Sequence, residues 1–264
     1  MTTALDRILA YKSDEVRALK AQRSVSDLLA DAKAQASTRG FCAGLDAVAA
    51  SGENALICEI KRKSPSAGDI LPGAVASEIA RDYEKGGAAC LSVLTDGPSF
   101  GGSLSDFEDI RNSVQLPMLR KDFMIDPYQI IESRAHGADC ILIILSAVDD
   151  ACARDLGQTA TDLGMDVLVE THDEPEIERA LRLSFPLIGV NNRDLKRMVT
   201  DLGTSERLSP LVPGDRQIVS ESGISDPEHI IRLRSFGLRR FLIGESLMKR
   251  PDRTAFTEAL RTAN

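Results

Sequence analysis

An acidic and a basic residue, Glu59 and Lys61, stand two positions apart at the end of an apolar segment over residues 55–60. Side chains alternate between the two faces of a β-strand, so we expect these two to point the same way. A charged pair at the end of an otherwise apolar strand costs free energy unless it binds or reacts with something. A turn expected over residues 64–68 follows directly. We therefore interpret this segment as part of a functional site rather than as a structural ion pair.

Residues of the same chemical types follow later apolar segments. Lys121, Glu170, Asn191 and Glu221 each stand where such a segment ends. Crowded carboxylate and ammonium groups shift one another's pKa, and burial can bring the pKa of a lysine or a glutamate towards neutrality, as general acid–base catalysis requires. A lysine could also form a Schiff base with a carbonyl substrate. The residue types alone leave both chemistries open.

Two glycine-containing turns indicate a phosphate site. Ser222-Gly223 and Gly244-Glu245 follow the last two apolar segments. Glycine lets the backbone approach a ligand closely, and backbone N–H groups at the start of a helix bind phosphate. Ser64 would add a hydroxyl group, and the Glu245 carboxylate would have to point away from the anion.

These residues require elements that bring distant segments together. Eight apolar segments of strand length alternate with helix-like amphipathic segments, and they cover residues 55–60, 90–94, 117–120, 140–146, 166–170, 187–190, 217–220 and 240–243. Nearly continuous apolar runs are typical of parallel strands covered on both faces. Eight such repeats predict an α/β fold, a (β/α)8 TIM barrel, with its active site at the carboxyl ends of the strands. A doubly wound sheet is the alternative, but residues 64–68 are not a glycine-rich phosphate fingerprint.

About fifty residues precede the first predicted strand. Residues 1–50 have a mostly helical pattern and predict an N-terminal extension of two or three helices that covers one end of the barrel. No change of composition marks a second domain, so we expect residues 1–264 to form a single barrel domain. Asp126-Pro127, Asp173 and Asp226-Pro227 predict helix starts.

Composition excludes several classes of function. The chain has 264 residues, of which 43% are hydrophobic and 27% charged, and its net charge of −8 argues against a nucleic-acid partner. Five scattered cysteines form no C-x-x-C pair and three histidines form no ligand pattern, so we expect a reducing compartment and no metal. No stretch resembles a leader or a membrane span. We expect a cytoplasmic protein that binds neither nucleic acid nor membranes.

Seven motifs resemble those of the indole-3-glycerol-phosphate synthase family of tryptophan biosynthesis. They occur in order along the whole chain, at residues 59–66 (EIKRKSPS), 92–96, 119–123, 169–170, 189–195, 220–224 and 243–248. The resemblance implies a carbon–carbon lyase, a decarboxylating enzyme that needs no cofactor. Its small-molecule substrate would be 1-(2-carboxyphenylamino)-1-deoxyribulose 5-phosphate, closed to an indole with loss of carbon dioxide and water. Other enzymes of the tryptophan pathway are the candidate protein partners.

The resemblance also implies roles for individual residues. Lys61 would bind the benzoate carboxylate, and Lys121 would protonate the carbonyl oxygen during ring closure. Glu170 would be the acid and base of the dehydration, and Glu59 would assist proton transfer and hold both lysines. The catalytic set is Glu59, Lys61, Lys121, Glu170 and Asn191, and the substrate-binding set is Ser64, Phe123, Leu142, Arg193, Leu195, Glu221, Ser222, Gly223, Gly244 and Glu245.

Two other functions are alternatives. The phosphoribosylanthranilate isomerase of the same pathway would use a cysteine or aspartate pair, at the first strand and at the sixth or seventh. Here Cys58 is one residue out of phase with Glu59 and should face the helices. A catalytically inactive barrel would be expected to lack Lys121, Glu59 or Glu170, and all three are present. One loop departs from the family pattern, because only Phe100 stands where many relatives carry two aromatic residues. His172 is interpreted as a loop or supporting residue rather than as a catalyst.

Overall fold

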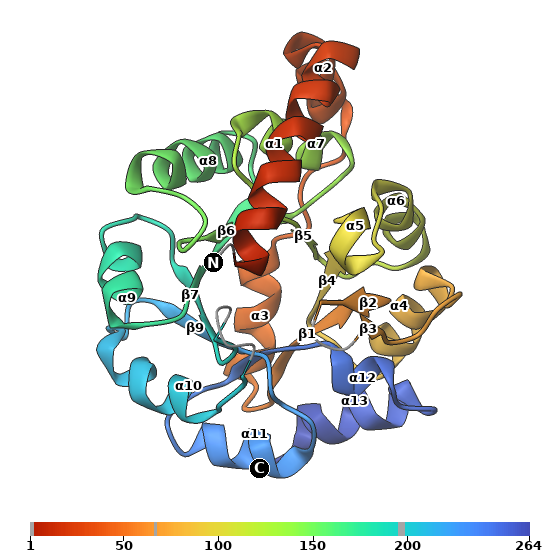
Figure 1. Cartoon of the computed structure of the whole chain (residues 1–264). Helices are drawn as coiled ribbons and strands as arrows, with labels where there is room; N and C mark the ends of the chain where they lie inside the picture. The colour runs from red at the N-terminus through yellow and green to blue at the C-terminus, as the bar shows by residue number, and fades with distance from the viewer. Residues whose placement is uncertain (1–2, 66–67, 195–198) are drawn as a thin grey trace.

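Eight parallel strands form a closed barrel in the computed structural model, which describes residues 3–65, 68–194 and 199–264. Their order around the barrel is β1-β10-β9-β8-β7-β6-β5-β4 (Figure 1). The bounds are β1 Ala55–Ile60, β4 Cys90–Leu94, β5 Met118–Lys121, β6 Cys140–Ile144, β7 Asp166–Thr171, β8 Leu187–Asn191, β9 Gln217–Glu221 and β10 Arg240–Ile243. The predicted (β/α)8 barrel is confirmed.

Four strands end one residue later than the apolar runs predicted. Lys121, Thr171, Asn191 and Glu221 are the last residues of β5, β7, β8 and β9, and Asn191 is paired with Glu221 in the β8–β9 ladder. The polar residues therefore belong to the strands, and strand alternation fixes which way they point. Two other predictions were wrong. The strand over 140–146 ends at Ile144, and the turn over 64–68 contains an antiparallel hairpin, β2 Lys63–Ser64 and β3 Gly68–Asp69.

Helices cover the outside of the barrel. Their bounds are α4 Ala76–Lys85, α6 Leu104–Ser113, α7 Pro127–Ala135, α8 Asp150–Asp162, α9 Glu174–Leu181, α10 Gly203–Leu208, α11 Pro227–Arg234 and α13 Arg253–Thr262, with the short helices α5 Gly97–Phe100 and α12 Glu245–Met248 and the 3-10 turn η1 Ser209–Leu211. Asp126, Asp173 and Asp226 cap α7, α9 and α11 by accepting hydrogen bonds from backbone N–H groups, as their positions predicted.

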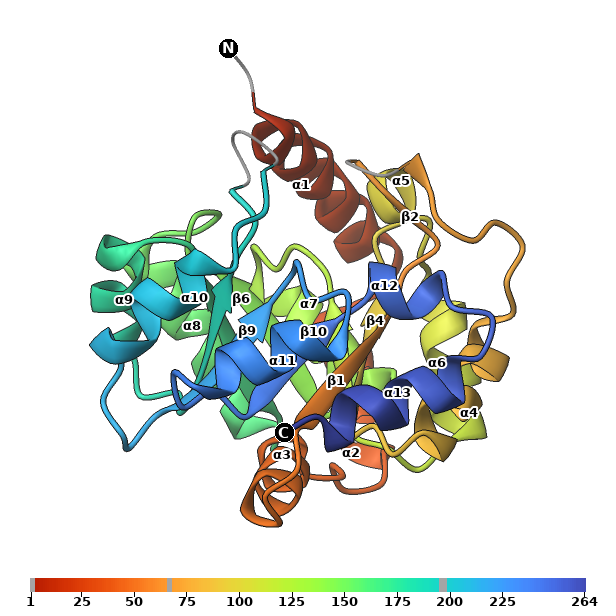
Figure 2. The same cartoon turned by 90° about the horizontal axis from the view of Figure 1, so that it is seen from below.

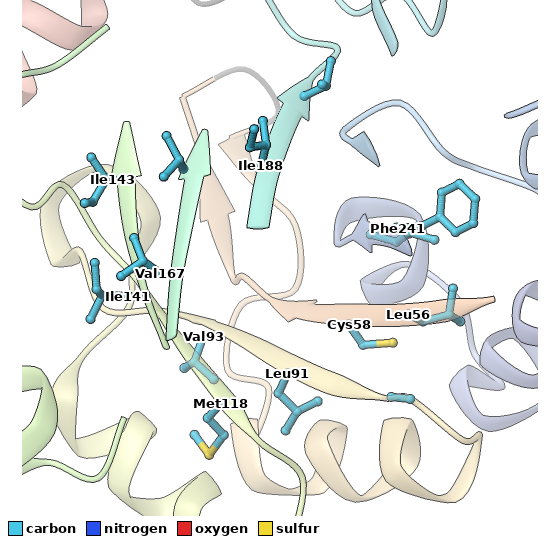
Figure 3. Packing of buried hydrophobic residues seen from close by; sticks show 14 of the residues in the cluster. Leu56, Cys58, Leu91, Val93, Met118, Ile141, Ile143, Val167, Ile188 and Phe241 are labelled. Atoms are coloured by element: carbon cyan, nitrogen blue, oxygen red, sulfur yellow. The ribbon is translucent and has the colours of Figure 1, made fainter. Parts of the chain in front are cut away.

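Strand alternation divides the core into two layers. Outward-facing residues such as Leu56, Cys58 and Val93 pack between the strands and the helices (Figure 3). Inward-facing residues such as Ile57 and Leu142 fill the barrel itself. The inward layer is apolar up to the carboxyl ends of the strands, where charged residues replace it.

The N-terminal extension covers both ends of the barrel, whereas the sequence predicted a cover at one end. It consists of α1 Ala4–Gln22, α2 Val25–Ala34 and α3 Phe41–Ala50. Figure 2 shows α1 and α3 at opposite ends of the barrel. Phe41 and Leu45 of α3 pack against the apolar inward layer, and the chain between α2 and α3 is tied to the amino end of β6 by the bond from Arg39 N–H to Asp139 Oδ1 (2.7 Å). In the described part of the chain, no helix is both long and apolar enough to cross a bilayer.

Candidate active site

A cavity of about 650 Å³ opens at the carboxyl ends of the strands. Every predicted site residue that the structure describes lines it: Glu59, Lys61, Ser64, Lys121, Phe123, Leu142, Glu170, Asn191, Arg193, Glu221, Ser222, Gly223, Gly244 and Glu245. The remaining predicted residue, Leu195, lies outside the described residues. Residues far apart in the sequence thus meet in one enclosed space, the setting in which catalytic groups of a barrel are expected.

The two charged groups at the end of β1 face each other. Lys61 Nζ lies 2.7 Å from Glu59 Oε1, and both side chains point into the cavity, as strand alternation predicted. Burial raises the pKa of Glu59, but the charges of Lys61 and Lys121 outweigh burial and hold that pKa below its usual range. Glu59 is therefore ionised at neutral pH, with Lys61 as its counter-charge.

Lys121 forms a second charged group. Its Nζ lies 3.1 Å from Glu170 Oε2 and 3.8 Å from Glu221 Oε2. Burial lowers the pKa of Lys121, but the surrounding glutamates, Glu170 first, raise it above its usual range. The ammonium group keeps its proton at neutral pH. This favours a role as an acid over Schiff-base formation, which needs the free amine.

The two carboxyl groups beside Lys121 have pKa values shifted in opposite directions. Burial raises both, but Lys121 and His172 outweigh it at Glu170 and hold the pKa of that carboxyl below its usual range. At Glu221 the charge of Glu170 adds to the effect of burial and raises the pKa well above its usual range. At neutral pH Glu170 is therefore charged while Glu221 holds a proton, an arrangement that separates a base from an acid.

The two predicted phosphate turns lie at the rim of the same cavity. Ser222 has a φ of 67° and Gly223 a φ of 85°, so the chain after β9 adopts a left-handed conformation that a serine rarely takes. Such strained residues concentrate at functional sites. Gly244 directly precedes α12, and the Glu245 carboxylate lies 2.6 Å from Lys249 Nζ and 4.0 Å from the Arg193 guanidinium. These two cations balance the negative charge of Glu245.

Known proteins resemble the chain in sequence and in fold. A profile of the indole-3-glycerol phosphate synthase family matches residues 5–260. The chain belongs to that family. The indole-3-glycerol phosphate synthase of Hyphomonas neptunium is 72% identical over 249 residues, 94% of each chain, and that of Rhodospirillum rubrum is 51% identical over 250 residues, 93% of this chain and 95% of the other. The tryptophan synthase subunit alpha from Legionella pneumophila, 15% identical, aligns with a TM-score of 0.61 over 86% of this chain and 98% of its own. This last likeness shows the barrel fold alone.

The structure also tests the alternative that the chain is a phosphoribosylanthranilate isomerase. Cys58 is fully buried in the layer between strands and helices, as its phase on β1 predicted, and it does not line the cavity. The first strand therefore presents Glu59 and not a thiol to the site. With family membership shown, an isomerase that uses a cysteine at this strand is not supported.

Sequence reasoning missed several residues of the cavity wall. Ala4, Leu5 and Ile8 of α1 line it, so the N-terminal helix is part of the site. Phe100, from the loop that departs from the family pattern, packs beside Phe123 with ring centroids 6.0 Å apart. The apolar residues at the start of α1 could have indicated a contact with the site. However, nothing in the sequence says which end of the barrel that helix covers.

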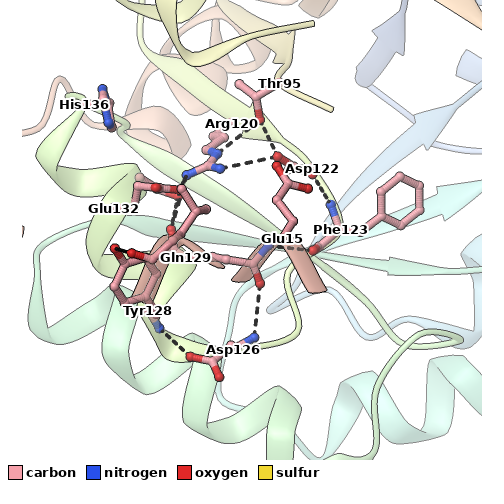
Figure 4. A network of polar contacts seen from close by, with 12 residues as sticks. Glu15, Thr95, Arg120, Asp122, Phe123, Asp126, Tyr128, Gln129, Glu132 and His136 are labelled. Atoms are coloured by element: carbon pink, nitrogen blue, oxygen red, sulfur yellow. Dashed lines mark hydrogen bonds and ion pairs between the residues drawn. The ribbon is translucent and has the colours of Figure 1, made fainter. Parts of the chain in front are cut away.

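Two polar residues that directly follow β4, Thr95 and Asp96, do not line the cavity. They belong to a buried polar network that joins the ends of β4 and β5 to α1 through Lys12. Thr95 Oγ1 donates to Asp122 Oδ2 (2.6 Å), and Arg120 lies between Asp122 and Glu132 (Figure 4). Strand phase explains the position of Thr95, because Leu94 points inward and the next residue must therefore point outward. Asp96 lies beyond the strand, where it caps α5 and pairs with Lys12 of α1 (3.0 Å).

Proposed function

We infer that the chain catalyses the reaction of its family, the closure of 1-(2-carboxyphenylamino)-1-deoxyribulose 5-phosphate to indole-3-glycerol phosphate with loss of carbon dioxide and water. Family membership, with 72% identity to a relative of that name, supports the reaction. The substrate carries a carboxylate, a ketone, hydroxyl groups and a phosphate, and the cavity offers residues of matching chemistry for each.

Ring closure needs an acid. The aromatic carbon that bears the carboxylate bonds to the ketone carbon, and the ketone oxygen takes a proton as that bond forms. We assign this proton to Lys121, whose ammonium group is held protonated beside Glu170 and Glu221. The bond to the carboxylate then breaks, carbon dioxide leaves, and the electron pair restores the aromatic ring. Lys61 is proposed to bind the carboxylate until it leaves.

Dehydration needs a base and an acid. A proton leaves the nitrogen-bearing carbon adjacent to the carbon that carries the new hydroxyl group, a carbon–carbon double bond forms between these two carbons, and the hydroxyl group departs as water after taking up a proton. The ionised Glu170 is proposed to take up this proton as the base and then, as the acid, to give it to the departing oxygen, while Glu59, which pairs with Lys61 (2.7 Å), assists the transfer. Asn191 and the protonated Glu221 would bind the ribulose hydroxyl groups.

The two ends of the substrate would lie against different parts of the wall. The proposed phosphate site consists of Ser64, Ser222, Gly223, Gly244 and Glu245. The proposed aromatic wall consists of Phe123, Leu142, Arg193 and Leu195. We also propose that the chain forms a single domain and works in the cytoplasm, with other tryptophan-pathway enzymes as its protein partners.

The observation that carries the assignment of roles is the position of Lys121 Nζ between the carboxyl groups of Glu170 and Glu221 in the cavity. The chain has no tryptophan, so the appearance of indole fluorescence reports the product with little background. We expect a rise on adding substrate to wild-type protein and a loss of at least about 100-fold in kcat for Lys121→Ala. Far-UV circular dichroism checks that the variant is folded.

Lys20→Ala is the matched control, because Lys20 contacts Asp126 and does not line the cavity. It should turn over substrate at the wild-type rate. Near-wild-type kcat in Lys121→Ala would remove Lys121 as the acid. A flat trace from folded wild-type protein would remove the reaction itself.

A further inference from the structure

We propose that His172 is a positioning residue that acts through Glu170: held in place by Glu176, it keeps the negative charge on Glu170 and the shared proton on Glu221. The inference rests on the proposed role of Glu170 as the base of the dehydration. His172 does not line the main cavity, so its effect on the reaction would be indirect.

The two oxygen atoms of the Glu170 carboxylate have different neighbours. Oε2 lies 3.1 Å from Lys121 Nζ, and Oε1 lies 3.4 Å from His172 Nε2. The buried Nε2 atom has no closer hydrogen-bond partner among the described residues. Contacts of this kind are often long in a free enzyme and shorten when substrate binds. Glu170 is thus placed between a lysine and an imidazole, whereas Glu221 lies farther from Lys121 (3.8 Å) and shares a side-chain hydrogen bond with Glu170.

The imidazole of His172 is fixed from its other side. Glu176 Oε2 accepts a hydrogen bond from the His172 backbone N–H (2.8 Å) and lies 3.0 Å from His172 Nδ1. Glu176 is in the first turn of α9, whose start is fixed by the Asp173 cap. One carboxylate therefore holds both the main chain and the ring of His172, so the ring cannot turn its Nε2 away from Glu170 without breaking these contacts.

Charge explains what the arrangement does. Burial lowers the pKa of His172, but Glu170 and Glu176 raise it to about 10, so the imidazole is a cation at neutral pH. His172 is the second cation beside Glu170, after Lys121. It therefore favours the state in which Glu170 is ionised and Glu221 is protonated. Without His172, the pKa values of Glu170 and Glu221 would lie closer together. The shared proton would then reside on Glu170 for a larger fraction of the time.

Other charged groups surround this set. Glu170 also faces Lys121 on β5, Glu221 on β9 and Glu59 on β1. His172 borders a second cavity of about 580 Å³, whose other charged lining residues, beside Glu176, are Asp6, Asp173, Arg193, Asp194, Asp201 and Arg207. Because these groups are the same in wild type and variant, a comparison of the two at each pH isolates the contribution of His172.

The test is kcat as a function of pH for His172→Asn, which keeps a side-chain donor but removes the cation. An opposite charge at this range shifts a carboxyl pKa by about 1–3 units. We therefore expect the ratio of variant to wild-type kcat to be at least about tenfold lower at pH 6 than at pH 9, because the shared proton is lost at high pH and Glu170 is then ionised in both proteins. Glu176→Gln, which leaves His172 in place but frees its ring, should show a smaller change in the same direction.

His136→Asn is the control, because His136 also contacts a glutamate (Glu108, 2.7 Å) but lies away from both cavities. Its ratio to wild type should not vary with pH. A His172→Asn ratio that is constant from pH 6 to pH 9, whatever its size, would overturn the proposal, since a purely structural loss does not depend on this titration. An inactive wild-type protein would instead remove the proposed function, so the two failures are distinguishable.

Discussion

Replacing Lys12 by methionine should destabilise the protein, because Lys12 joins the N-terminal helix to the barrel. The Lys12 side chain is fully buried, and its Nζ lies 2.9 Å from Asp122 Oδ1, 3.0 Å from Asp96 Oδ1 and 2.8 Å from Glu15 Oε2. Methionine has a similar length and shape, so the substitution removes the charge with little change of volume. Asp96 and Asp122 would then remain buried with one cation fewer.

The size of the expected loss in the free energy of unfolding follows from the burial of these charges. Removing one partner of a buried ion pair costs about 3–5 kcal/mol, because the other charge stays buried without compensation. For a chain of this size, that corresponds to a fall in Tm of roughly 6–20 °C. The direction of this change, a loss of stability on removing Lys12, agrees with the pKa shifts. The pKa of Lys12 is raised, despite burial, by Asp122 and Glu15, and that of Asp122 is lowered, despite burial, by Arg120 and Lys12, so at pH 7 both groups stabilise the fold.

Thermal unfolding followed by circular dichroism measures the effect, with Lys20→Met as the control. Lys20 is on the same helix and its contact with Asp126 is partly exposed, so that variant should lose at most about 1 kcal/mol. The stability that Asp122 contributes is lost as the pH falls through the range in which carboxylates protonate, so the difference between wild type and Lys12→Met should shrink below about pH 4. Equal Tm values for the two variants at pH 7 would refute the reasoning.

Two further predictions concern close packing and the C-terminal helix. Gly189→Ala would place a Cβ atom against Glu221 Oε1, so we expect kcat/KM to fall by at least about tenfold, whereas Gly214→Ala, with open space around it, should leave steady-state kinetics unchanged. Asn54→Ala should destabilise the protein by about 1–3 kcal/mol in urea unfolding, because Asn54 Nδ2 donates to three carbonyl oxygens near the end of the chain at 2.9–3.0 Å. An unfolding midpoint equal to that of wild type would contradict this account of Asn54.

The barrel could be predicted from the sequence because each strand is a short, mostly apolar run and the runs alternate with amphipathic helical segments. The runs over 55–60, 90–94 and 240–243 match β1, β4 and β10 at both ends. The position of α1 could not be predicted in this way, since it depends on Lys12 meeting Asp96 and Asp122 from distant parts of the chain. The hairpin of β2 and β3 was missed because strands of two residues have no periodicity to detect.

Residue type alone also could not assign roles to the three buried glutamates of the cavity. Glu59 is ionised beside Lys61, and Glu170 is ionised beside Lys121 and His172. The pKa of Glu221 is raised by burial and by the charge of Glu170. The difference comes from how the strands align, which decides the neighbours of each carboxyl group.

Two inward-facing glycines make this crowding sterically possible. A Cβ atom on Gly189 of β8 would collide with the Glu221 carboxylate, and one on Gly244 after β10 would lie 2.5 Å from Glu59 Oε1. At each position the missing side chain leaves room for the carboxylate of the adjacent strand. The absence of a side chain at 189 and 244 is therefore as much a part of the acid–base arrangement as the glutamates themselves, because a larger residue would push the carboxylates out of reach of Lys121 and Lys61.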